Sequence, residues 1–372
     1  MKEFRRIILL LLAVLLIVTV TSCSKEEETS AADSEESTMY IPVISKGFQH
    51  QFWQTVMSGA EKAGEDLGVD MVFEGPTSEA AIQEQVQMLQ NALAKDPSAI
   101  AFAALDTSSV MDQLQEAVRR GIPIIGFDSG VPNAPEGAIY ANAATDNYAA
   151  AGMAAEKMFE EIGDDLGMAT PANPATLIVI SQDATSESVT SRGFGFRDGM
   201  IDLLVSQAGM SKDMIRVEGN PAYIADDSPQ SDNPAIIIDM IVPASPRTQD
   251  VVASSNAVFN RVEDDNIRGI FASNEGTVVG VLASTNDGAQ LESTYDEVVV
   301  IGYDAGEAQK NAVRQGYFLG SITQDPYMIG YKAVELAVKA AQGESVSDVD
   351  TGAKFYDASN MDNDDIAPLL YD

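Results

Sequence analysis

From Met39 to Ala341, the sequence alternates short apolar runs with amphipathic segments of helical length. The clearest run is Val298–Ile301, whose four β-branched residues suit a strand buried on both faces of a parallel sheet. We expect a helix over residues 305–314 directly after it, and the next strand over residues 318–323. Regular alternation of this kind predicts an α/β fold built from doubly wound parallel sheets.

Two polar residues stand where these strands end, Asp304 after the first strand and Gln324 after the second. In open α/β sheets, ligands bind at the carboxyl ends of the strands, so both are candidate ligand residues. The alternative is that Asp304 caps a helix and Gln324 fills a loop. Taken alone, this stretch does not decide between the two interpretations.

The other expected helices carry local start signals. Ser78 is the expected N-cap of a helix over residues 78–94, and Asp146 is the expected N-cap of a long alanine-rich helix that ends at Ile162. The proline-rich region 220–247 is the least regular part of the chain. In it, the apolar run 236–242 is a candidate strand, and the remainder is expected to be an inserted loop.

Length and charge limit the possible functions. With 372 residues, of which 45% are hydrophobic, the chain can build two domains. It carries 57 acidic and 22 basic residues, a formal net charge of −35. A field of this sign repels phosphate backbones, so we expect no nucleic-acid partner.

The first residues predict an export signal. After a basic start, residues 7–20 are apolar apart from Thr19. This run is shorter than the roughly 20 residues that cross a bilayer, so it predicts a signal-peptide core. The next residues match the bacterial lipobox, which ends in Cys23, the only cysteine. We expect residues 1–22 to be a lipoprotein signal peptide, Cys23 to carry a lipid anchor, and residues 23–39 to form an acidic flexible tether.

Enzyme signatures are missing from the sequence. His50 is the only histidine, and a zinc site would need partners that the sequence does not offer, so we expect no metal. There is no G-x-S-x-G elbow, no Walker A sequence and no dinucleotide fingerprint. The sequence therefore predicts a protein that is not an enzyme and has no cofactor.

An ordered set of motifs runs through the chain. They are SKGFQHQFWQTVMSGAEKA, IPIIGFDSG, ATDNYAAAG, SRGFGFRDGM, FASNEGTVVGVL, VVVIGYDAG and GSITQDPYMIGYKA. In this order they resemble the ribose-type periplasmic sugar-binding proteins, the solute receptors of ABC importers. The resemblance extends from Tyr40 to Gly343.

The resemblance implies the type I periplasmic binding protein fold, in which two doubly wound parallel-sheet lobes are joined by a hinge. The amino-terminal lobe would comprise residues 40–145 and 325–350. The carboxy-terminal lobe would comprise residues 146–324 and 351–372.

The resemblance also implies a ligand-binding set. Asp128 and Asp304 match hydroxyl acceptors, Arg192 matches the guanidinium donor, and Asn274 and Gln324 match amide ligands. Phe52 and Trp53 match the pair that stacks on the sugar ring, and Tyr223 is a guess for a third aromatic residue. Lys46 and His50 complete the expected ligand set, although they stand where the family has serine and asparagine, and Ser129 stands where ribose binders have arginine. These departures argue against ribose itself as the ligand.

The implied function is that of an extracytoplasmic solute-binding lipoprotein. It would capture a monosaccharide in the cleft between the lobes and deliver it to an ABC permease, as a monomer anchored through Cys23 in the periplasm or at the cell surface. Two alternatives stay open, a sensor module that feeds a chemoreceptor or kinase, and a nucleoside-binding lipoprotein. A sugar-responsive repressor is disfavoured, because the signal peptide stands where its DNA-binding domain would be.

Overall fold

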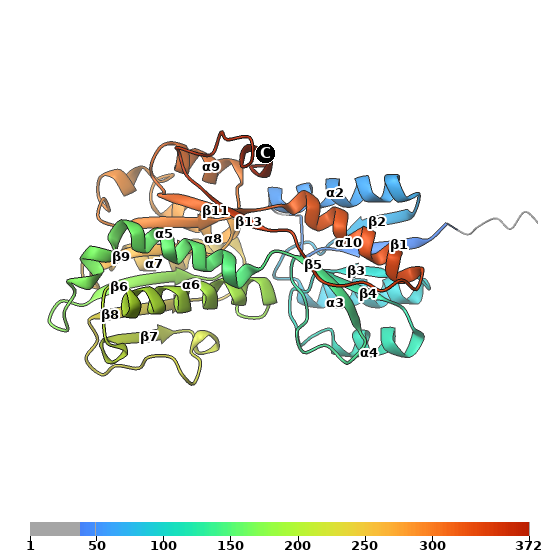
Figure 1. Ribbon diagram of the computed structural model, residues 1–372, viewed down its shortest axis with the longest axis horizontal. Helices are drawn as coiled ribbons and strands as arrows, with labels where there is room; N and C mark the ends of the chain where they lie inside the picture. The colour runs from blue at the N-terminus through green and yellow to red at the C-terminus, as the bar shows by residue number, and fades with distance from the viewer. Residues whose placement is uncertain (1–37, 49, 372) are drawn as a thin grey trace, which may run out of the picture. The chain divides into compact units, whose positions relative to one another are not determined.

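The computed structural model describes residues 38–48 and 50–371, and residues 38–372 form one compact unit. The predicted signal peptide, Cys23 and most of the predicted tether lie outside the described residues. No helix among the described residues is long and apolar enough to cross a membrane. Within the unit, the strands form two separate sheets with helices on both faces, so the prediction of two α/β lobes is confirmed (Figure 1).

The first lobe is built on a six-stranded sheet in the order β12-β5-β4-β3-β1-β2. Its strands are β1 (Tyr40–Ile44), β2 (Asp70–Glu74), β3 (Ile100–Phe102), β4 (Ile124–Phe127), β5 (Ile139–Ala144) and β12 (Val349–Asp350). All of these strands pair in parallel. Helices α2 (Gln51–Leu67) and α10 (Pro326–Ala341) lie side by side on one face, and α3 (Ile82–Ala94) and α4 (Met111–Arg120) cover the other (Figure 1).

The second lobe is built on a seven-stranded sheet in the order β13-β11-β10-β9-β6-β8-β7. Its strands are β6 (Ala175–Ile180), β7 (Ile215–Gly219), β8 (Ile236–Ile241), β9 (Ile267–Ala272), β10 (Val299–Tyr303), β11 (Gly320–Gln324) and β13 (Ala353–Tyr356). Helices α5 (Asn147–Gly167) and α6 (Glu187–Ser206) pack together, as do α7 (Thr248–Phe259) and α8 (Glu275–Ser284), and α9 (Glu307–Arg314) follows β10. Among the described strands, only β13 runs antiparallel to its neighbour, β11.

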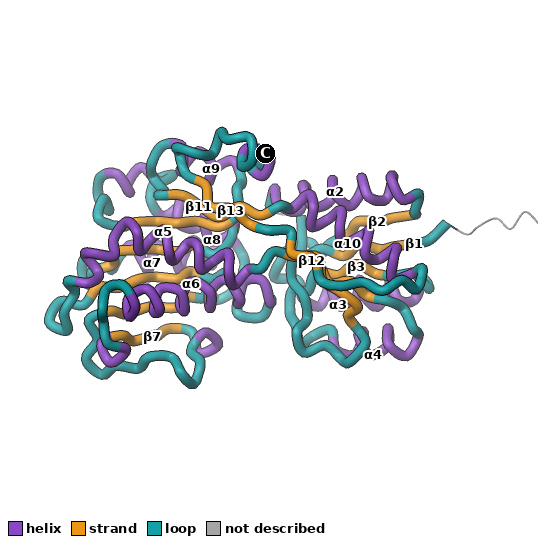
Figure 2. Tube along the Cα trace, in the orientation of Figure 1, coloured by secondary structure: helices purple, strands orange, loops and turns teal. Residues whose placement is uncertain are grey.

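The chain passes between the two sheets at residues 144–147, 324–326 and 350–353 (Figure 2). The first two crossings leave the carboxyl ends of β5 and β11, and the third joins β12 to β13. The carboxyl ends of the central strands of both sheets therefore face the junction of the lobes. This arrangement places the residues that follow those strands on either side of one cleft.

The expected start of one helix is wrong. α3 begins at Ile82, and its N-cap position is Ala81 rather than Ser78. Ser78 lies in a turn instead, where its hydroxyl accepts a hydrogen bond from the amide of Ala80 at 3.2 Å. The residues before the helix form a loop that carries Glu79 into the molecule. By contrast, Asp146 does cap α5, accepting from the amide of Ala149 at 3.0 Å.

The proline-rich region contains the predicted strand. Residues 236–241 form β8, which is inserted in the sheet between β6 and β7. β8 has a neighbouring strand on both edges, and its residues Ile236, Ile238 and Met240 pack in the core of the lobe. The loop between β7 and β8 is pinned by a hydrogen bond from the side chain of Gln230 to the carbonyl oxygen of Val217, 2.8 Å long.

Candidate ligand-binding site

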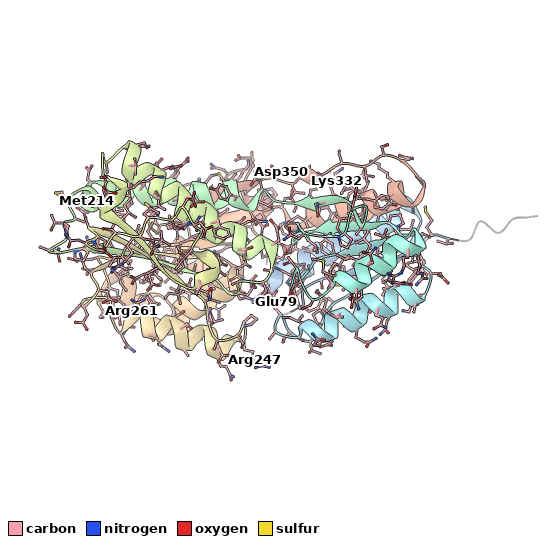
Figure 3. The ribbon with its side chains drawn as sticks, turned by 90° about the horizontal axis from the view of Figure 1, so that it is seen from below. Glu79, Met214, Arg247, Arg261, Lys332 and Asp350 are labelled. Atoms are coloured by element: carbon pink, nitrogen blue, oxygen red, sulfur yellow. The ribbon has the colours of Figure 1, made fainter. Side chains whose placement is uncertain are left out.

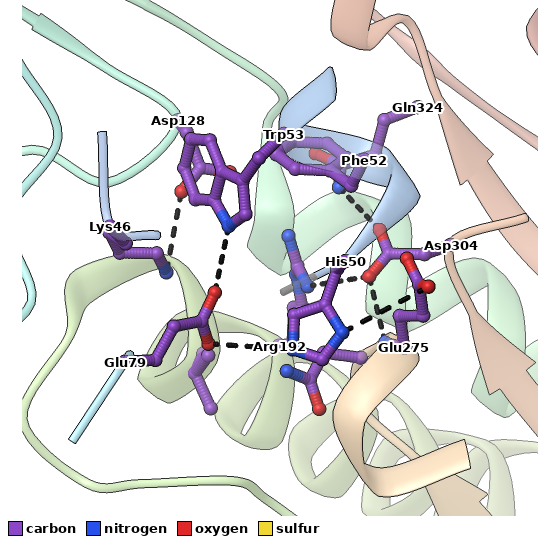
Figure 4. A pocket seen from close by; sticks show the side chains of 12 residues that line it. Lys46, His50, Phe52, Trp53, Glu79, Asp128, Arg192, Glu275, Asp304 and Gln324 are labelled. Carbon is purple, nitrogen blue, oxygen red and sulfur yellow. Dashed lines mark hydrogen bonds and ion pairs between the residues drawn. The ribbon is translucent and has the colours of Figure 1, made fainter. Parts of the chain in front are cut away.

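A cavity lies where the carboxyl ends of the strands of both lobes meet (Figure 4). Its lining contains all nine ligand residues expected from the sequence, together with three that were not expected. The lining residues are Lys46, His50, Phe52, Trp53, Glu79, Asp128, Val189, Arg192, Asn274, Glu275, Asp304 and Gln324.

Asp128 follows β4 of the first lobe and forms an ion pair with Lys46, which follows β1. The Lys46 Nζ lies 3.3 Å from Asp128 Oδ2, and both side chains are buried. Burial raises the pKa of Asp128 above its usual value, although Lys46 and Arg192 act against the shift. The carboxylate therefore pairs with a lysine at the wall of the cavity.

Asp304 is the centre of the second lobe's contribution. Its Oδ1 accepts a hydrogen bond from Gln324 Nε2 at 2.7 Å, and its Oδ2 accepts from the backbone amide of Glu275 at 2.9 Å. Arg192 Nη1 lies 3.8 Å from Asp304 Oδ2. The following helix, α9, has Gly306 as its N-cap residue, so Asp304 does not cap it.

The guanidinium group of Arg192 is fixed by the second lobe. Its Nε donates to Asn147 Oδ1 at 2.8 Å, and its Nη1 donates to the carbonyl oxygen of Ser273 at 3.1 Å. The group also stacks on the ring of Tyr303, with Cζ 3.9 Å from the ring centroid. Since these contacts hold the side chain in one position, Arg192 presents a fixed cation to the cavity.

The two amide side chains differ in what they can offer a ligand. Asn274 caps α8, because its Oδ1 accepts from the amide of Thr277 at 3.0 Å, and its Nδ2 donates to Gln182. Both ends of that amide are therefore engaged. Gln324 donates to Asp304, but its Oε1 is buried with no hydrogen-bond partner among the described residues. Gln324 is thus the amide with an acceptor left for a ligand.

Phe52 and Trp53 begin α2 and both line the cavity. Their rings meet edge to face, with centroids 5.0 Å apart and an interplanar angle of 87°. The two faces they offer are therefore nearly perpendicular. Tyr223, the guessed third aromatic residue, is fully buried beside Phe194 and does not line this cavity.

Two carboxylates in the cavity were not expected from the sequence. Glu79, labelled in Figure 3, accepts from Trp53 Nε1 at 2.7 Å (Figure 4). It also accepts from Gln182 Nε2 at 2.5 Å, so it contacts both lobes. Glu275 begins α8, and its Oε2 is buried without a hydrogen-bond partner among the described residues. His50 stands between them, 3.9 Å from an oxygen of each. Both glutamates follow strand ends, so the rule that selected Asp304 also applies to them.

The two glutamates have opposite pKa shifts. Burial raises the pKa of Glu275, and the nearby Asp304 adds to the shift. Burial would also raise the pKa of Glu79, but His50, Lys46 and the hydrogen bonds from Trp53 and Gln182 together lower it below its usual value. Glu79 is therefore a carboxylate satisfied by its neighbours, whereas Glu275 is short of a donor.

The cavity as a whole is rich in charged groups. Four carboxylates face the permanent cations Lys46 and Arg192 and the imidazole of His50. No group of three or more histidine, cysteine or acidic side chains among the described residues is arranged to hold a metal ion. Carboxylates accept hydrogen bonds, cations donate them and amides do both, so the site suits a ligand that carries many hydroxyl groups.

Comparisons with known proteins bear on this geometry. A model of the periplasmic binding protein domain matches residues 41–345. The ribose import binding protein of Haemophilus influenzae is 22% identical over 79% of this chain and 83% of that protein.

Two solved structures are also similar. One, described as an ABC transporter, LacI family transcriptional regulator from Brachyspira murdochii, is 36% identical, with a TM-score of 0.73, and the match covers 90% of this chain and 99% of that one. The other is a carbohydrate transporter solute-binding protein from Agrobacterium radiobacter in complex with D-arabinose, which is 26% identical with a TM-score of 0.70 over 90% and 99% of the two chains.

Proposed function

The chain belongs to the periplasmic binding protein domain family, and on that premise we propose that it is a solute-binding lipoprotein of an ABC importer. In this proposal it captures a monosaccharide in the cavity between the lobes and delivers it to a permease in the inner membrane. The sugar-bound structural relative supports a sugar as the ligand class.

The observation that carries the proposal is the composition of the cavity wall. Asp128 comes from the first lobe, and Arg192 and Asp304 come from the second, so acceptors and a fixed donor face the same space from both sides. Trp53 adds flat apolar area beside these charges, which suits the apolar face of a sugar ring. We assign hydrogen bonds to sugar hydroxyls to the charged groups and to Gln324.

Hydrogen bonds between the lobes support closure around the ligand. Lys46 Nζ donates to Ser188 Oγ at 3.1 Å, and the amide of Ser188 donates to Ser129 Oγ at 3.3 Å. Nearby, the hydroxyl of Thr185 donates to the carbonyl oxygen of Leu105 at 3.1 Å. We propose that one lobe comprises residues 40–145 and 325–350 and that the other comprises residues 146–324 and 351–372. Each of these hydrogen bonds then joins the two lobes, so it must break when the lobes separate.

The anchor and the location are part of the same proposal. Lipidation of Cys23 would hold the chain at a membrane outside the cytoplasm, and residues 23–39 would separate the folded unit from that membrane. We propose a monomer, because one cavity formed by one chain contains the whole set of ligand residues.

A sugar screen tests the proposal. Thermal shift with neutral pentoses and hexoses should identify a sugar that raises the melting temperature, because ligand that binds only the folded state stabilises it. Calorimetry should then give one sugar per chain, and sugar phosphates and nucleosides serve as comparison ligands. If a nucleoside binds and no sugar does, the ligand class is wrong; if nothing in the screen binds, the transport role is unsupported.

A further inference from the structure

The peptide unit that follows Asp304 is held on both of its polar groups by the carboxy-terminal segment, residues 351–371. The carbonyl oxygen of Asp304 accepts a hydrogen bond from the hydroxyl of Tyr356 at 3.1 Å. The amide of the next residue, Ala305, donates to the hydroxyl of Tyr371 at 3.1 Å. One tyrosine therefore donates to this peptide and the other accepts from it.

This peptide has a reason to need support. Asp304 has a φ of 81°, in the left-handed region that residues other than glycine rarely adopt. Such a conformation persists only where surrounding contacts impose it. Ser321 adds a third contact, because its hydroxyl donates to the same carbonyl oxygen at 3.0 Å. The direction of the Asp304 carboxylate depends on this backbone.

The segment reaches the site by a route that the rest of the second lobe stabilises. β13, which contains Tyr356, is the edge strand of the sheet and pairs antiparallel with β11. In this register, Ser321 lies opposite Tyr356. Further along, the carbonyl oxygen of Leu369 accepts a hydrogen bond from the hydroxyl of Thr323 at 2.8 Å. Met361 and Ile366 anchor the intervening turns in the hydrophobic core. A packed segment therefore places Tyr371 beside the Ala305 amide and Phe52.

Tyr371 also contacts the first lobe. Its ring meets the ring of Phe52 edge to face, with centroids 6.3 Å apart and an interplanar angle of 68°. Phe52 lines the cavity from one lobe and Asp304 lines it from the other. A single side chain near the end of the chain thus contacts an element of the site in each lobe.

We propose that the carboxy-terminal segment is a built part of the ligand site, in which Tyr356 and Tyr371 are positioning residues. They fix the peptide between residues 304 and 305 and so aim the Asp304 carboxylate into the cavity, and Tyr371 supports Phe52 across the lobe junction. The statement that Asp304 binds the ligand rests on the proposed function. The support of the peptide itself does not depend on it.

The test compares three variants of the full chain. Tyr356→Phe combined with Tyr371→Phe keeps both rings but removes both hydroxyls from the peptide, and Tyr371→Ala also removes the contact with Phe52. Ile215→Ala is the matched control, because Ile215 is a buried residue of β7, at the opposite edge of the same sheet from β13, and does not line the cavity. The control lowers the melting temperature through packing alone.

The first readout needs no ligand. Hydrogen exchange at the Ala305 amide should be at least about tenfold faster in the double Phe variant than in the parent, because the amide has lost its acceptor. It should be unchanged in Ile215→Ala. Equal exchange in the parent and the double variant would overturn the proposal, whatever the protein binds.

The second readout is the affinity for the sugar that the parent chain binds most tightly among D-ribose, D-arabinose, D-glucose and D-galactose. We expect the double Phe variant to bind it about tenfold more weakly and Tyr371→Ala more weakly still, while Ile215→Ala stays within about twofold. A loss in Ile215→Ala as large as that in the double variant would mean general destabilisation and would also overturn the proposal. If the folded parent binds none of these sugars, the ligand class is at fault, and the exchange result alone decides the role of the segment.

Discussion

Asp128 and Asp304, one from each lobe, both have backbone conformations in the left-handed region, with φ of 54° and 81°. Each such conformation costs on the order of 1–3 kcal/mol in a non-glycine residue. Both aspartates follow buried strands, and both carboxylates line the cavity. The conformational cost at two matching positions is consistent with selection for the direction of a side chain rather than for stability.

Removing any one of the three charged ligand residues should therefore weaken sugar binding strongly. Asp128→Ala, Arg192→Ala and Asp304→Ala should each cost roughly 2–5 kcal/mol in binding free energy, because each leaves buried polar partners unsatisfied. Calorimetry measures the loss. Arg261→Ala is the control, since Arg261 pairs with Asp239 at 2.6 Å in the second lobe, away from Glu79 and the cavity (Figure 3). Arg261→Ala should lower the stability of the protein and leave its affinity for the sugar unchanged. A loss of affinity in Arg261→Ala with no loss in the three site variants would contradict the site assignment.

The opposite pKa shifts of Glu275 and Glu79 give a paired prediction on pH and stability. The pKa of Glu275 is raised in the folded state, so its charged form opposes folding at neutral pH. Glu275→Gln should therefore raise the melting temperature of the sugar-free protein at pH 7. The gain should shrink as the pH falls through the raised pKa, because the glutamate of the parent then becomes neutral.

Glu79→Gln should have the opposite effect. The pKa of Glu79 is lowered in the folded state, so its charged form contributes stability above its unfolded pKa. The variant should melt at a lower temperature than the parent at pH 7, and the deficit should vanish as the pH falls through the lowered pKa. Melting curves from pH 3 to pH 8 test both variants, and the same sign for both would contradict the charge arrangement described for the cavity.

At the scale of elements, helices α2 and α10 are in unusually close contact. A Cβ atom on Gly59 of α2 would lie 1.9 Å from the carbonyl oxygen of Tyr327 in α10, and one on Gly330 would lie 1.9 Å from that of Val56. Neither helix can accept a side chain at these positions without moving. Because Phe52 and Trp53 lie in the first turn of α2, the position of the helix also sets the position of both aromatic rings.

Gly59→Ala should therefore lower the free energy of unfolding by about 1–3 kcal/mol and also weaken sugar binding. Gly152→Ala is the matched control, since Gly152 lies in helix α5 and a Cβ atom there would meet no atom within 4 Å. The control should raise stability by up to about 1 kcal/mol, because alanine favours helix more than glycine does. Urea unfolding of both variants decides, and equal stability of the two would contradict the close helix contact.

The fold was predictable from the sequence because its signals are local. Buried β-branched runs such as Val298–Ile301 determine where the strands lie, and their alternation with helices determines the doubly wound sheets. The ordered motifs also predicted the family, which the match over residues 41–345 confirms. Helix starts were less predictable. Ser78 has the chemistry of an N-cap, but the loop that contains it carries Glu79 into the cavity instead.

The candidate site was predicted only in part, because part of it depends on contacts between distant residues. The structure brings all nine nominated residues to one cavity. The role of Glu79 depends on its bonds to Trp53 and Gln182, which come from different lobes. The role of Tyr371 depends on the path of the last twenty residues. Their sequence has no periodic pattern that shows where the chain end packs.

At the scale of the whole molecule, the proposed anchor makes its own prediction. Cys23→Ser should abolish both lipidation and cleavage before residue 23, because the thiol is the group that carries the lipid. Mass spectrometry of the native amino terminus would show a lipidated cysteine in the parent and an uncleaved, unmodified chain in the variant. An unmodified parent that begins at any other residue would remove the lipoprotein from the proposal.

For the molecule as a whole, we propose that the two lobes close around the ligand, because only a closed form brings Asp128 and Asp304 to the same ligand. Trp53 is the only tryptophan, and in the closed arrangement described here it is 1% exposed beside the cavity. Separation of the lobes should expose its ring to water, so its emission reports closure without background.

The most direct measurement is a sugar titration followed at once by Trp53 emission and by small-angle scattering. We predict a blue shift of the emission and a decrease in the radius of gyration with the same midpoint, at one sugar per chain. Trp53→Phe should keep most of the affinity and lose the optical signal. A sugar that binds by calorimetry but changes neither the emission nor the radius of gyration would contradict the binding of a ligand between two closing lobes.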